Sequence, residues 1–118
     1  MAAPFHLDIL AASVPFYRGD CVSLVLPTSD GGELRFETAE GEQRRAAVAP
    51  GLFKVENGRV LLLVDAAERP EDIDVNRALR AREEAEEELR QKRSMAEYHL
   101  AQSQLARAMN RLRVSGRG

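Results

Sequence analysis

VLLLVDAAERPEDIDVNRA, residues 60–78, contains the point at which one kind of secondary structure gives way to another. It begins with five consecutive apolar residues, Val60–Val64, and a short apolar run of this kind is typical of a strand. Pro70 follows. From Glu71 to Ser115 there is no glycine or proline, and Ala, Glu, Arg, Leu and Gln, which favour helix, dominate. The stretch therefore divides the chain into a strand-rich part before Pro70 and a helical part after it.

The part before Pro70 is typical of short strands joined by turns. Asn57-Gly58 lies between the apolar runs 52–55 and 60–64 and predicts a hairpin, because both central residues of a type I′ turn need positive φ. Since the run 60–64 is apolar without alternation, both of its faces are expected to be covered. Alternating apolar and polar residues predict further strands at 5–9, 22–26 and 34–36, and turns are expected at Gly19-Asp20, 29–32 and Glu40-Gly41.

The part after Pro70 is typical of two helices in an antiparallel hairpin. A turn is expected at Lys92-Arg93-Ser94, with Ser94 as N-cap and Glu97 at the capping-box spacing. Asp72 or Asp74 is expected to cap the first helix. The apolar seams are rich in alanine, which buries little area, so we expect the hairpin to be only modestly attached to anything. The seam residues are Ala78, Ala81, Ala85 and Leu89 in the first helix and Tyr98, Ala101, Leu105, Ala108 and Leu112 in the second.

The predicted fold class is α+β, with an antiparallel β-sandwich domain over residues 1–69 and an α-helical hairpin domain over residues 70–118. The chain has 118 residues and a net charge of −2, and a near-neutral balance argues against a dedicated nucleic-acid binder. A single cysteine, Cys21, excludes an internal disulfide framework and fits a reducing compartment. No apolar run approaches the ~20 residues that span a bilayer, and no secretory signal is visible. We therefore expect a soluble intracellular chain that reaches a membrane only through a partner.

The residues that could carry chemistry do not indicate catalysis. His6 and His99 are isolated from any cluster of cysteines or carboxylates at metal-ligand spacing, so we expect no metal site. The sequence has neither a Gly-x-x-x-x-Gly-Lys phosphate loop nor a nucleophile elbow. The chain is therefore expected to act by binding rather than by catalysis.

Charge changes sign along the chain. Residues 1–72 carry 7 basic and 12 acidic side chains, and residues 73–118 carry 10 and 7. The acidic run 83–88 favours a solvated helix face with i,i+4 pairs such as Glu86–Arg90 and Glu88–Lys92. The basic end of the second helix, with an apolar seam behind it, favours a docking surface for an acidic partner.

Several stretches together resemble one family. Residues 60–78 resemble the junction between sandwich and hairpin in the epsilon subunit of F-type ATP synthases, and QSQLARAMNRLRV, 102–114, resembles the last helix of that subunit. Residues 5–10 and 17–27 resemble its first strands. No one motif is decisive, but their order and spacing cover nearly the whole chain.

The sequence departs from the family after the third strand. TSDGGELR, residues 28–35, passes directly between segments that the family separates by a further block, long enough for two short strands. We expect the sandwich to lose part of a sheet and to expose new edges. The resemblance implies that this region faces the membrane ring of c subunits, so the departure puts that contact in doubt.

The resemblance implies a non-catalytic rotor subunit with no required cofactor. Its expected partners are the gamma subunit, the membrane ring of c subunits and the alpha/beta catalytic hexamer, with no nucleic acid and no membrane insertion. The resemblance implies that the sandwich lies at the foot of the stalk, on the cytoplasmic side of the bacterial cell membrane. The hairpin either folds down or extends into the hexamer, and the extended form blocks rotation during hydrolysis. The residues expected to contact a partner are Leu105, Met109, Leu112 and Arg113, together with Arg107 and Arg111.

The resemblance also implies a possible regulatory ATP site. Some bacterial members bind ATP through an Ile-Asp-x-x-Arg-Ala motif, which here is Ile73–Ala78. Glu68 matches a further nucleotide contact of the family. Two positions where ATP-binding relatives carry additional arginines are here Glu84 and Leu100, which should weaken phosphate binding.

Residue spacing predicts which residues of the motif lie at the same height as residues of the second helix. With a turn centred near 92–93, residues whose numbers sum to about 185 lie level, so Asp74 is level with Arg111 and Ala78 with Arg107. Arg77, Arg107 and Arg111 then converge on one anion, with Asp74 beside them. The simpler interpretation is that Asp74 only caps its helix and pairs with an arginine.

A second function class fits the same charge pattern. In this alternative the chain is a stand-alone adaptor, which regulates a large enzyme by inserting its acidic helical hairpin into a channel of that enzyme. This alternative leaves Ile73–Ala78 and the terminal run 106–112 unexplained.

Overall fold

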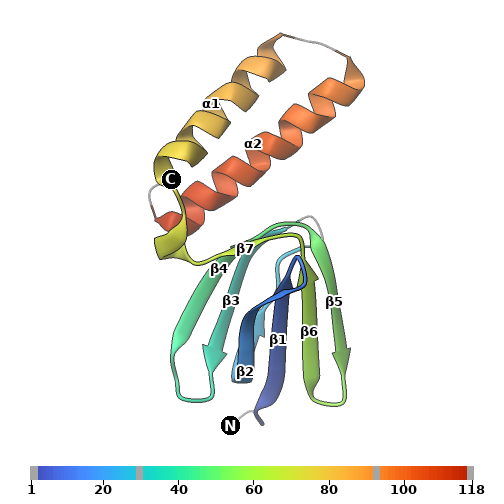
Figure 1. Ribbon diagram of the computed structural model, residues 1–118, viewed down its shortest axis with the longest axis vertical. Coiled ribbons are helices and arrows are strands. Elements are labelled where there is room, and N and C mark those ends of the chain that lie inside the picture. Colours follow the sequence, from blue (N-terminus) through green and yellow to red (C-terminus); the bar gives the residue numbers. More distant parts are fainter. Residues whose placement is uncertain (1–2, 29–30, 92–93, 117–118) are drawn as a thin grey trace. The chain divides into compact units, whose positions relative to one another are not determined.

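A computed structural model of the chain describes residues 3–28, 31–91 and 94–116. The chain divides into two compact units, Met1–Arg69 and Pro70–Gly118. In the described residues the first unit is built from strands and the second from helices (Figure 1).

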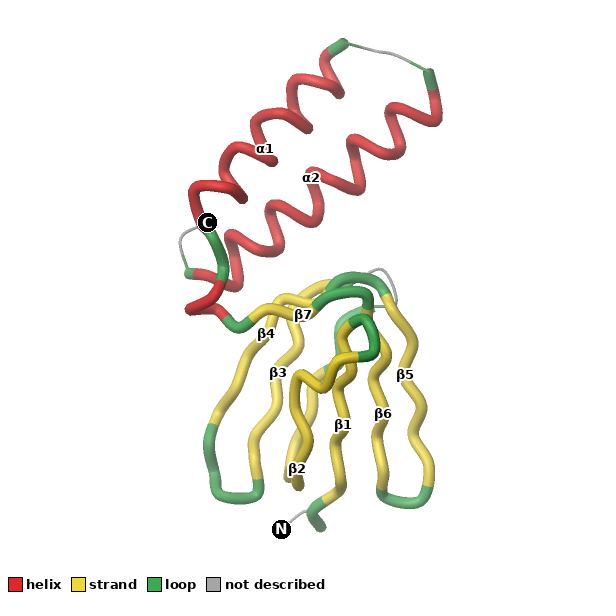
Figure 2. Tube along the Cα trace, viewed as in Figure 1, coloured by secondary structure: helices red, strands yellow, loops and turns green. Residues whose placement is uncertain are grey.

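The first unit contains one hydrogen-bonded sheet in the order β5-β6-β1-β2-β3-β4-β7 (Figure 2). Every neighbouring pair is antiparallel except β1 and β6, which run parallel. The sequence patterns indicated only antiparallel pairing, so the parallel pair is a correction. The strands are β1 (Phe5–Ala11), β2 (Val14–Val25), β3 (Gly32–Thr38), β4 (Gln43–Val48), β5 (Gly51–Glu56), β6 (Arg59–Val64) and β7 (Ala67–Glu68).

One hydrophobic core joins the two halves of this sheet. Leu7 and Ile9 of β1 are completely buried in the same cluster as Leu34 and Phe36 of β3. The sheet therefore folds over a shared interior, which is the small β-sandwich that the strand spacing predicted.

The prediction that both faces of residues 60–64 are covered is wrong. Val60, Leu62 and Val64 are buried, but Leu63 is 45% exposed. The strand alternates like any half-buried strand, and leucine simply occupies its outward position as well.

Residues with positive φ lie at turns of the first unit. Asn57 and Gly58 have φ of 49° and 75°, so the predicted hairpin between β5 and β6 is confirmed as a turn with two positive φ values. Gly31, at φ 98°, donates its N–H to the carbonyl of Thr28 at 3.0 Å, while Ser29 and Asp30 of the expected turn lie outside the described residues. The turn expected at Gly19-Asp20 is wrong, because both residues lie inside β2.

The second unit is a pair of helices that follow a short 3₁₀ turn. The elements are η1 (Pro70–Asp72), α1 (Val75–Arg90) and α2 (Met95–Ser115). Ser94 caps α2 by accepting the N–H of Glu97 at 3.3 Å, as predicted, while Lys92 and Arg93 of the expected turn lie outside the described residues. Gly116 ends α2 in the left-handed conformation, at φ 81°.

Alanine dominates the buried positions of the hairpin. The helices α1 and α2 pack against each other. Ala78 and Ala85 are buried in α1, and Ala101, Ala108 and Leu112 are buried in α2. Tyr98 is 38% exposed, so the predicted seam weakens toward the start of α2. Neither helix, within the described residues, is long and apolar enough to cross a membrane.

Candidate functional site: the basic end of the helical hairpin

The carboxyl end of α2 carries the residues that the sequence marked for partner binding. Arg107 and Arg113 are exposed. Met109, which lies between them in the sequence, is 49% exposed. Leu105 is half-buried, whereas Leu112 is only 1% exposed. Four of these five side chains are accessible to a partner while the hairpin is closed, and Leu112 is not.

The start of α1 holds Asp74, whose role is visible in the geometry. Asp74 is the N-cap, and its Oδ1 accepts a hydrogen bond from the backbone N–H of Arg77 at 3.0 Å. Ile73, just before it, is buried, while the side chains of Asp74 and Arg77 are exposed. The expected cap is therefore present, and it occupies one carboxylate oxygen of Asp74.

The two segments meet at one end of the hairpin. The second helix returns antiparallel to the first and also contacts η1, at the start of the unit (Figure 1). Arg107 and Arg111 therefore belong to the end of the hairpin that contains Asp74 and Arg77. Glu68, the remaining nucleotide candidate, lies on β7 in the first unit.

The acidic run on α1 behaves as a solvated helix face. Glu87 accepts from Arg90 at 2.7 Å, and this hydrogen bond lowers the pKa of Glu87. Arg82 lies 3.5 Å from Glu86. Arg90 therefore pairs with Glu87 and not with the predicted Glu86, while Lys92 of the predicted pair with Glu88 lies outside the described residues. The interpretation of this face as exposed i,i+3 and i,i+4 pairing stands.

Asn110 is a residue that the sequence analysis missed. It is 9% exposed, and its Oδ1 has no hydrogen-bond partner among the described residues. An asparagine beside Arg111 is typical of an exposed position, so only its spacing of four residues from Val114, which is also buried, signals an inward one. Within the same described residues, no group of three or more His, Cys, Asp or Glu side chains is placed to hold a metal ion.

The fold is similar to that of a chain in a solved ATP synthase structure. The structure is similar to a chain in a cryo-EM structure of the Euglena gracilis mitochondrial ATP synthase, OSCP/F1/c-ring, with a TM-score of 0.54 and 18% identity over 98% of this chain and 67% of that one. At this identity the likeness shows the fold alone. A family model described as ATP synthase, Delta/Epsilon chain, long alpha-helix domain, matches residues 71–116.

Curated relatives extend the match over the whole length. The ATP synthase epsilon chain of Caldanaerobacter subterraneus subsp. tengcongensis is 34% identical over 135 positions, covering 99% of this chain and 97% of the relative. The epsilon chain of Caldicellulosiruptor bescii is 37% identical, covering 96% and 94%. The chain therefore belongs to the ATP synthase epsilon chain family, a family of non-catalytic subunits.

The alignments also bear on the shortened sandwich. They run over 135 and 132 positions for two relatives, whereas this chain has 118 residues. The relatives therefore carry residues that this chain lacks. The comparisons do not place those residues along the chain, and the departure predicted at residues 28–35 stays a prediction; the structure shows Thr28 and Gly31 bridged between β2 and β3.

Proposed function

We propose that the chain is the central-stalk subunit that couples rotation to ATP synthesis and restrains ATP hydrolysis through α2. Family membership over nearly the whole chain carries the proposal. It is supported by exposed arginines at the carboxyl end of α2 and by a hairpin whose buried contacts are mostly alanine. A seam of this kind holds two helices together with little buried area, which suits an element that changes position.

The proposed partners are the gamma subunit, the c ring and the alpha/beta hexamer, on the cytoplasmic face of a bacterial membrane. In this proposal residues 1–69 and 70–118 act as two domains, the first as the attachment to the rotor and the second as the inhibitory arm. Arg107, Arg111 and Arg113 meet acidic surfaces of the hexamer, and Leu105 and Met109 supply apolar contacts. Leu112 joins them only after the hairpin opens, because it is buried in the closed form.

The test uses ATP hydrolysis by a reconstituted alpha/beta/gamma complex. Adding the full chain should lower the rate of ATP hydrolysis. Adding a chain without residues 94–118 should leave that rate as high as in the complex alone. Arg107→Ala with Arg113→Ala should also relieve inhibition, whereas the matched pair Arg80→Ala with Arg90→Ala, exposed on α1, should not. Equal rates with the full and shortened chains would remove the inhibitory role and leave only coupling.

A regulatory ATP is a second, finer proposal for the same end of the hairpin. The proposed contacts are Arg77, Arg107 and Arg111. Asp74, which belongs to the Ile73–Ala78 motif, and Glu68, which precedes that motif, complete the proposed set. Two facts weaken the site: one oxygen of Asp74 is engaged in capping, and Glu84 and Leu100 replace cations. Calorimetric titration with MgATP tests it, and absence of heat together with an unchanged melting temperature at millimolar nucleotide would remove it.

The adaptor alternative now has less support than the stalk subunit. The match to the ATP synthase epsilon chain of Caldanaerobacter subterraneus subsp. tengcongensis covers 99% of this chain, and so it includes regions that the adaptor leaves unexplained. Co-purification of the chain with a gamma-type subunit separates the two functions, because an adaptor for another enzyme has no reason to bind gamma.

A further inference from the structure

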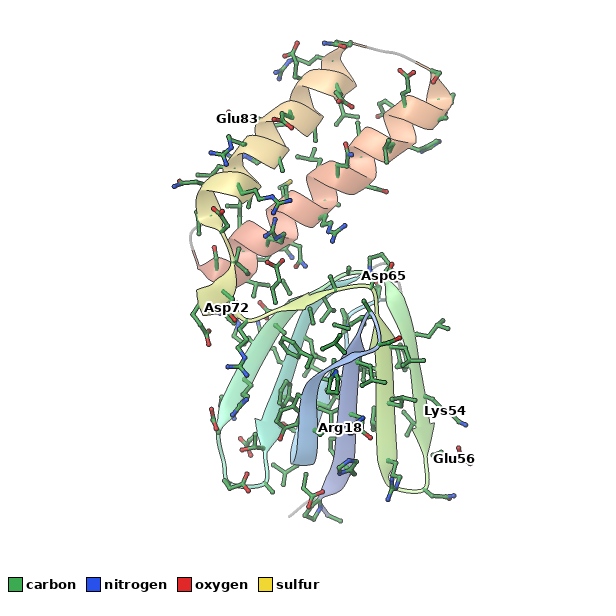
Figure 3. The ribbon with its side chains drawn as sticks, in the orientation of Figure 1. Arg18, Lys54, Glu56, Asp65, Asp72 and Glu83 are labelled. Carbon is green, nitrogen blue, oxygen red and sulfur yellow. The ribbon has the colours of Figure 1, made fainter. Side chains whose placement is uncertain are left out.

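Asn110 is a polar residue that α2 buries without a hydrogen bond. It is 9% exposed, and its Oδ1 has no hydrogen-bond partner in residues 3–28, 31–91 and 94–116. Glu83 of α1, by comparison, is exposed and points away from α2 (Figure 3). A buried amide without a partner costs free energy, because it gives up its hydrogen bonds to water and gains none in return.

Arg82 of α1 shows what compensation of a buried polar atom looks like in the same hairpin. Its Nε is also buried without a hydrogen bond among the described residues. However, its side chain is 36% exposed, and Oε1 of Glu86 lies 3.5 Å from Nε as an ion-pair partner. Asn110 is far less exposed than Arg82 and carries no charge for a neighbour to neutralise, so its burial is the less compensated of the two.

The buried side of α2 that holds Asn110 is not the side that forms the seam with α1. Ala101, Ala108 and Leu112 are buried at spacings of seven and four residues, which places them on one face. A helix turns by about 100° per residue, so Asn110, two residues from both Ala108 and Leu112, lies nearly opposite them. Val114, four residues after Asn110, is on the same side and is completely buried. The helix is therefore buried on two faces, and release of α2 from its packed position exposes both.

Asparagine is also an unfavourable residue for this place in a helix. It is a weaker helix former than alanine or leucine, and Asn110 lies inside the 21-residue helix α2. A residue that goes against both helix propensity and burial is expected where function, rather than stability, determines the side chain. Arg107, Met109 and Arg113, which carry the proposed contacts with the hexamer, lie within three residues of Asn110.

We propose that Asn110 biases α2 toward release and thereby sets how strongly the chain inhibits hydrolysis. This inference rests on the proposed function, in which α2 leaves the hairpin and contacts the alpha/beta hexamer. While α2 is packed, the buried amide lowers the stability of the packed form. After release the amide is free to bond to solvent or to a polar group of the hexamer beside Arg107 and Met109. The amide therefore favours the released form over the packed one.

Hydrogen exchange of the α2 amides measures this release in the full chain without any partner. Asn110→Leu replaces the side-chain amide by an apolar group of the same branching, and Asn110→Ala removes it without adding volume. Where exchange follows the opening equilibrium, at least one of the two variants should slow it about tenfold. Gln104→Leu and Gln104→Ala remove an amide from an exposed position of the same helix, and they should leave exchange unchanged.

The reconstituted alpha/beta/gamma complex then tests the consequence for inhibition. The Asn110 variant that slows exchange should need about tenfold more chain for half-inhibition of ATP hydrolysis, because the form that binds is rarer by the same factor. If the natural chain does not inhibit at all, the proposed function fails, and the regulatory half of this inference fails with it. The exchange rates still decide separately whether the buried amide destabilises the packed form.

Three results overturn the role of Asn110. Faster or unchanged exchange in both Asn110 variants means that the buried amide does not destabilise the packed form. Equal slowing in the Gln104 variants assigns the effect to helix propensity instead of burial. Slower exchange with an unchanged half-inhibiting concentration means that this release does not precede inhibition. Circular dichroism of every variant confirms that each is folded.

Discussion

The backbone N–H of Arg77 donates to Oδ1 of Asp74 at 3.0 Å, and this bond closes the first turn of α1. A helix leaves its first N–H groups without internal partners, so a carboxylate at this position stabilises the helix. The same residue belongs to the motif that implies ATP binding, and its two possible roles are separable by substitution.

Asp74→Ala should therefore lower the free energy of unfolding of the hairpin by about 1 kcal/mol, and Asp74→Ser, which keeps a capping oxygen, should lose much less. Thermal melting followed by helical circular dichroism measures both. If alanine and serine variants melt together with the natural chain, the capping role of Asp74 is wrong.

The alanine seam should resist larger side chains. Ala108 is 2% exposed in α2, so Ala108→Leu forces the helices apart and should destabilise the hairpin by about 1–3 kcal/mol. Ala106→Leu, two residues earlier and exposed, adds the same atoms outside the seam and should change stability by less than about 0.5 kcal/mol. Urea unfolding measures the difference, and equal effects at both positions would contradict a close-packed seam.

Glu33 should make the first unit sensitive to acid. Its carboxylate accepts from Arg45 Nη2 at 2.5 Å and from Arg35, and these hydrogen bonds lower the pKa of Glu33. Because the pKa is lower in the folded state, the stabilisation is present above the unfolded value of about 4.3 and is lost as pH falls through the folded value. The stability advantage of the natural chain over Glu33→Gln should shrink as pH falls below the unfolded value of about 4.3.

Denaturant unfolding at several pH values measures that advantage. Glu40→Gln, in the exposed β3–β4 turn, serves as the control substitution. An advantage over Glu33→Gln that stays constant across the range would mean that the arginines do not hold the carboxylate in its charged form.

Tyr17 should make the first unit sensitive to alkali. Burial, followed by the hydrogen bond that Cys21 donates to its hydroxyl, raises the pKa of Tyr17 to about 12. A raised pKa means that the stabilisation is complete below the unfolded value near 10 and is lost as pH rises toward 12. Tyr17→Phe should unfold at higher pH than the natural chain.

A spectroscopic titration checks the same point directly. In the Tyr98→Phe variant Tyr17 is the sole remaining tyrosine, and its tyrosinate absorbance should appear near pH 12. Ionisation at an ordinary pH near 10 would show that the ring is not held in a desolvated site.

Local patterns in the sequence predicted the elements that depend on near neighbours. The Asn57-Gly58 hairpin and the caps at Asp74 and Ser94 are all decided within a few residues. The pairing of β1 with β6 and the short strand β7 were not predicted, because they depend on residues more than forty positions away or on a two-residue contact.

The candidate site was predictable in its residue types but not in its accessibility. Arg107 and Arg113 were expected to be exposed and are. Periodicity placed Leu112 on the hairpin seam and the resemblance offered it as a partner contact, and only coordinates show that the seam buries it. Asn110 was missed for the opposite reason, because a polar residue was assumed to point outward.

The parallel contact between β1 and β6 governs how the chain acquires its shape during synthesis. The first strand leaves the ribosome early, but its second neighbour, Arg59–Val64, follows only after most of the unit has been made. Until then one side of the first strand stays open, and closing the sheet requires a long chain loop, which slows folding. The contacts within the helical hairpin are local, so the two helices can form as soon as they leave the ribosome. We therefore expect the hairpin to fold faster than the strand unit that precedes it.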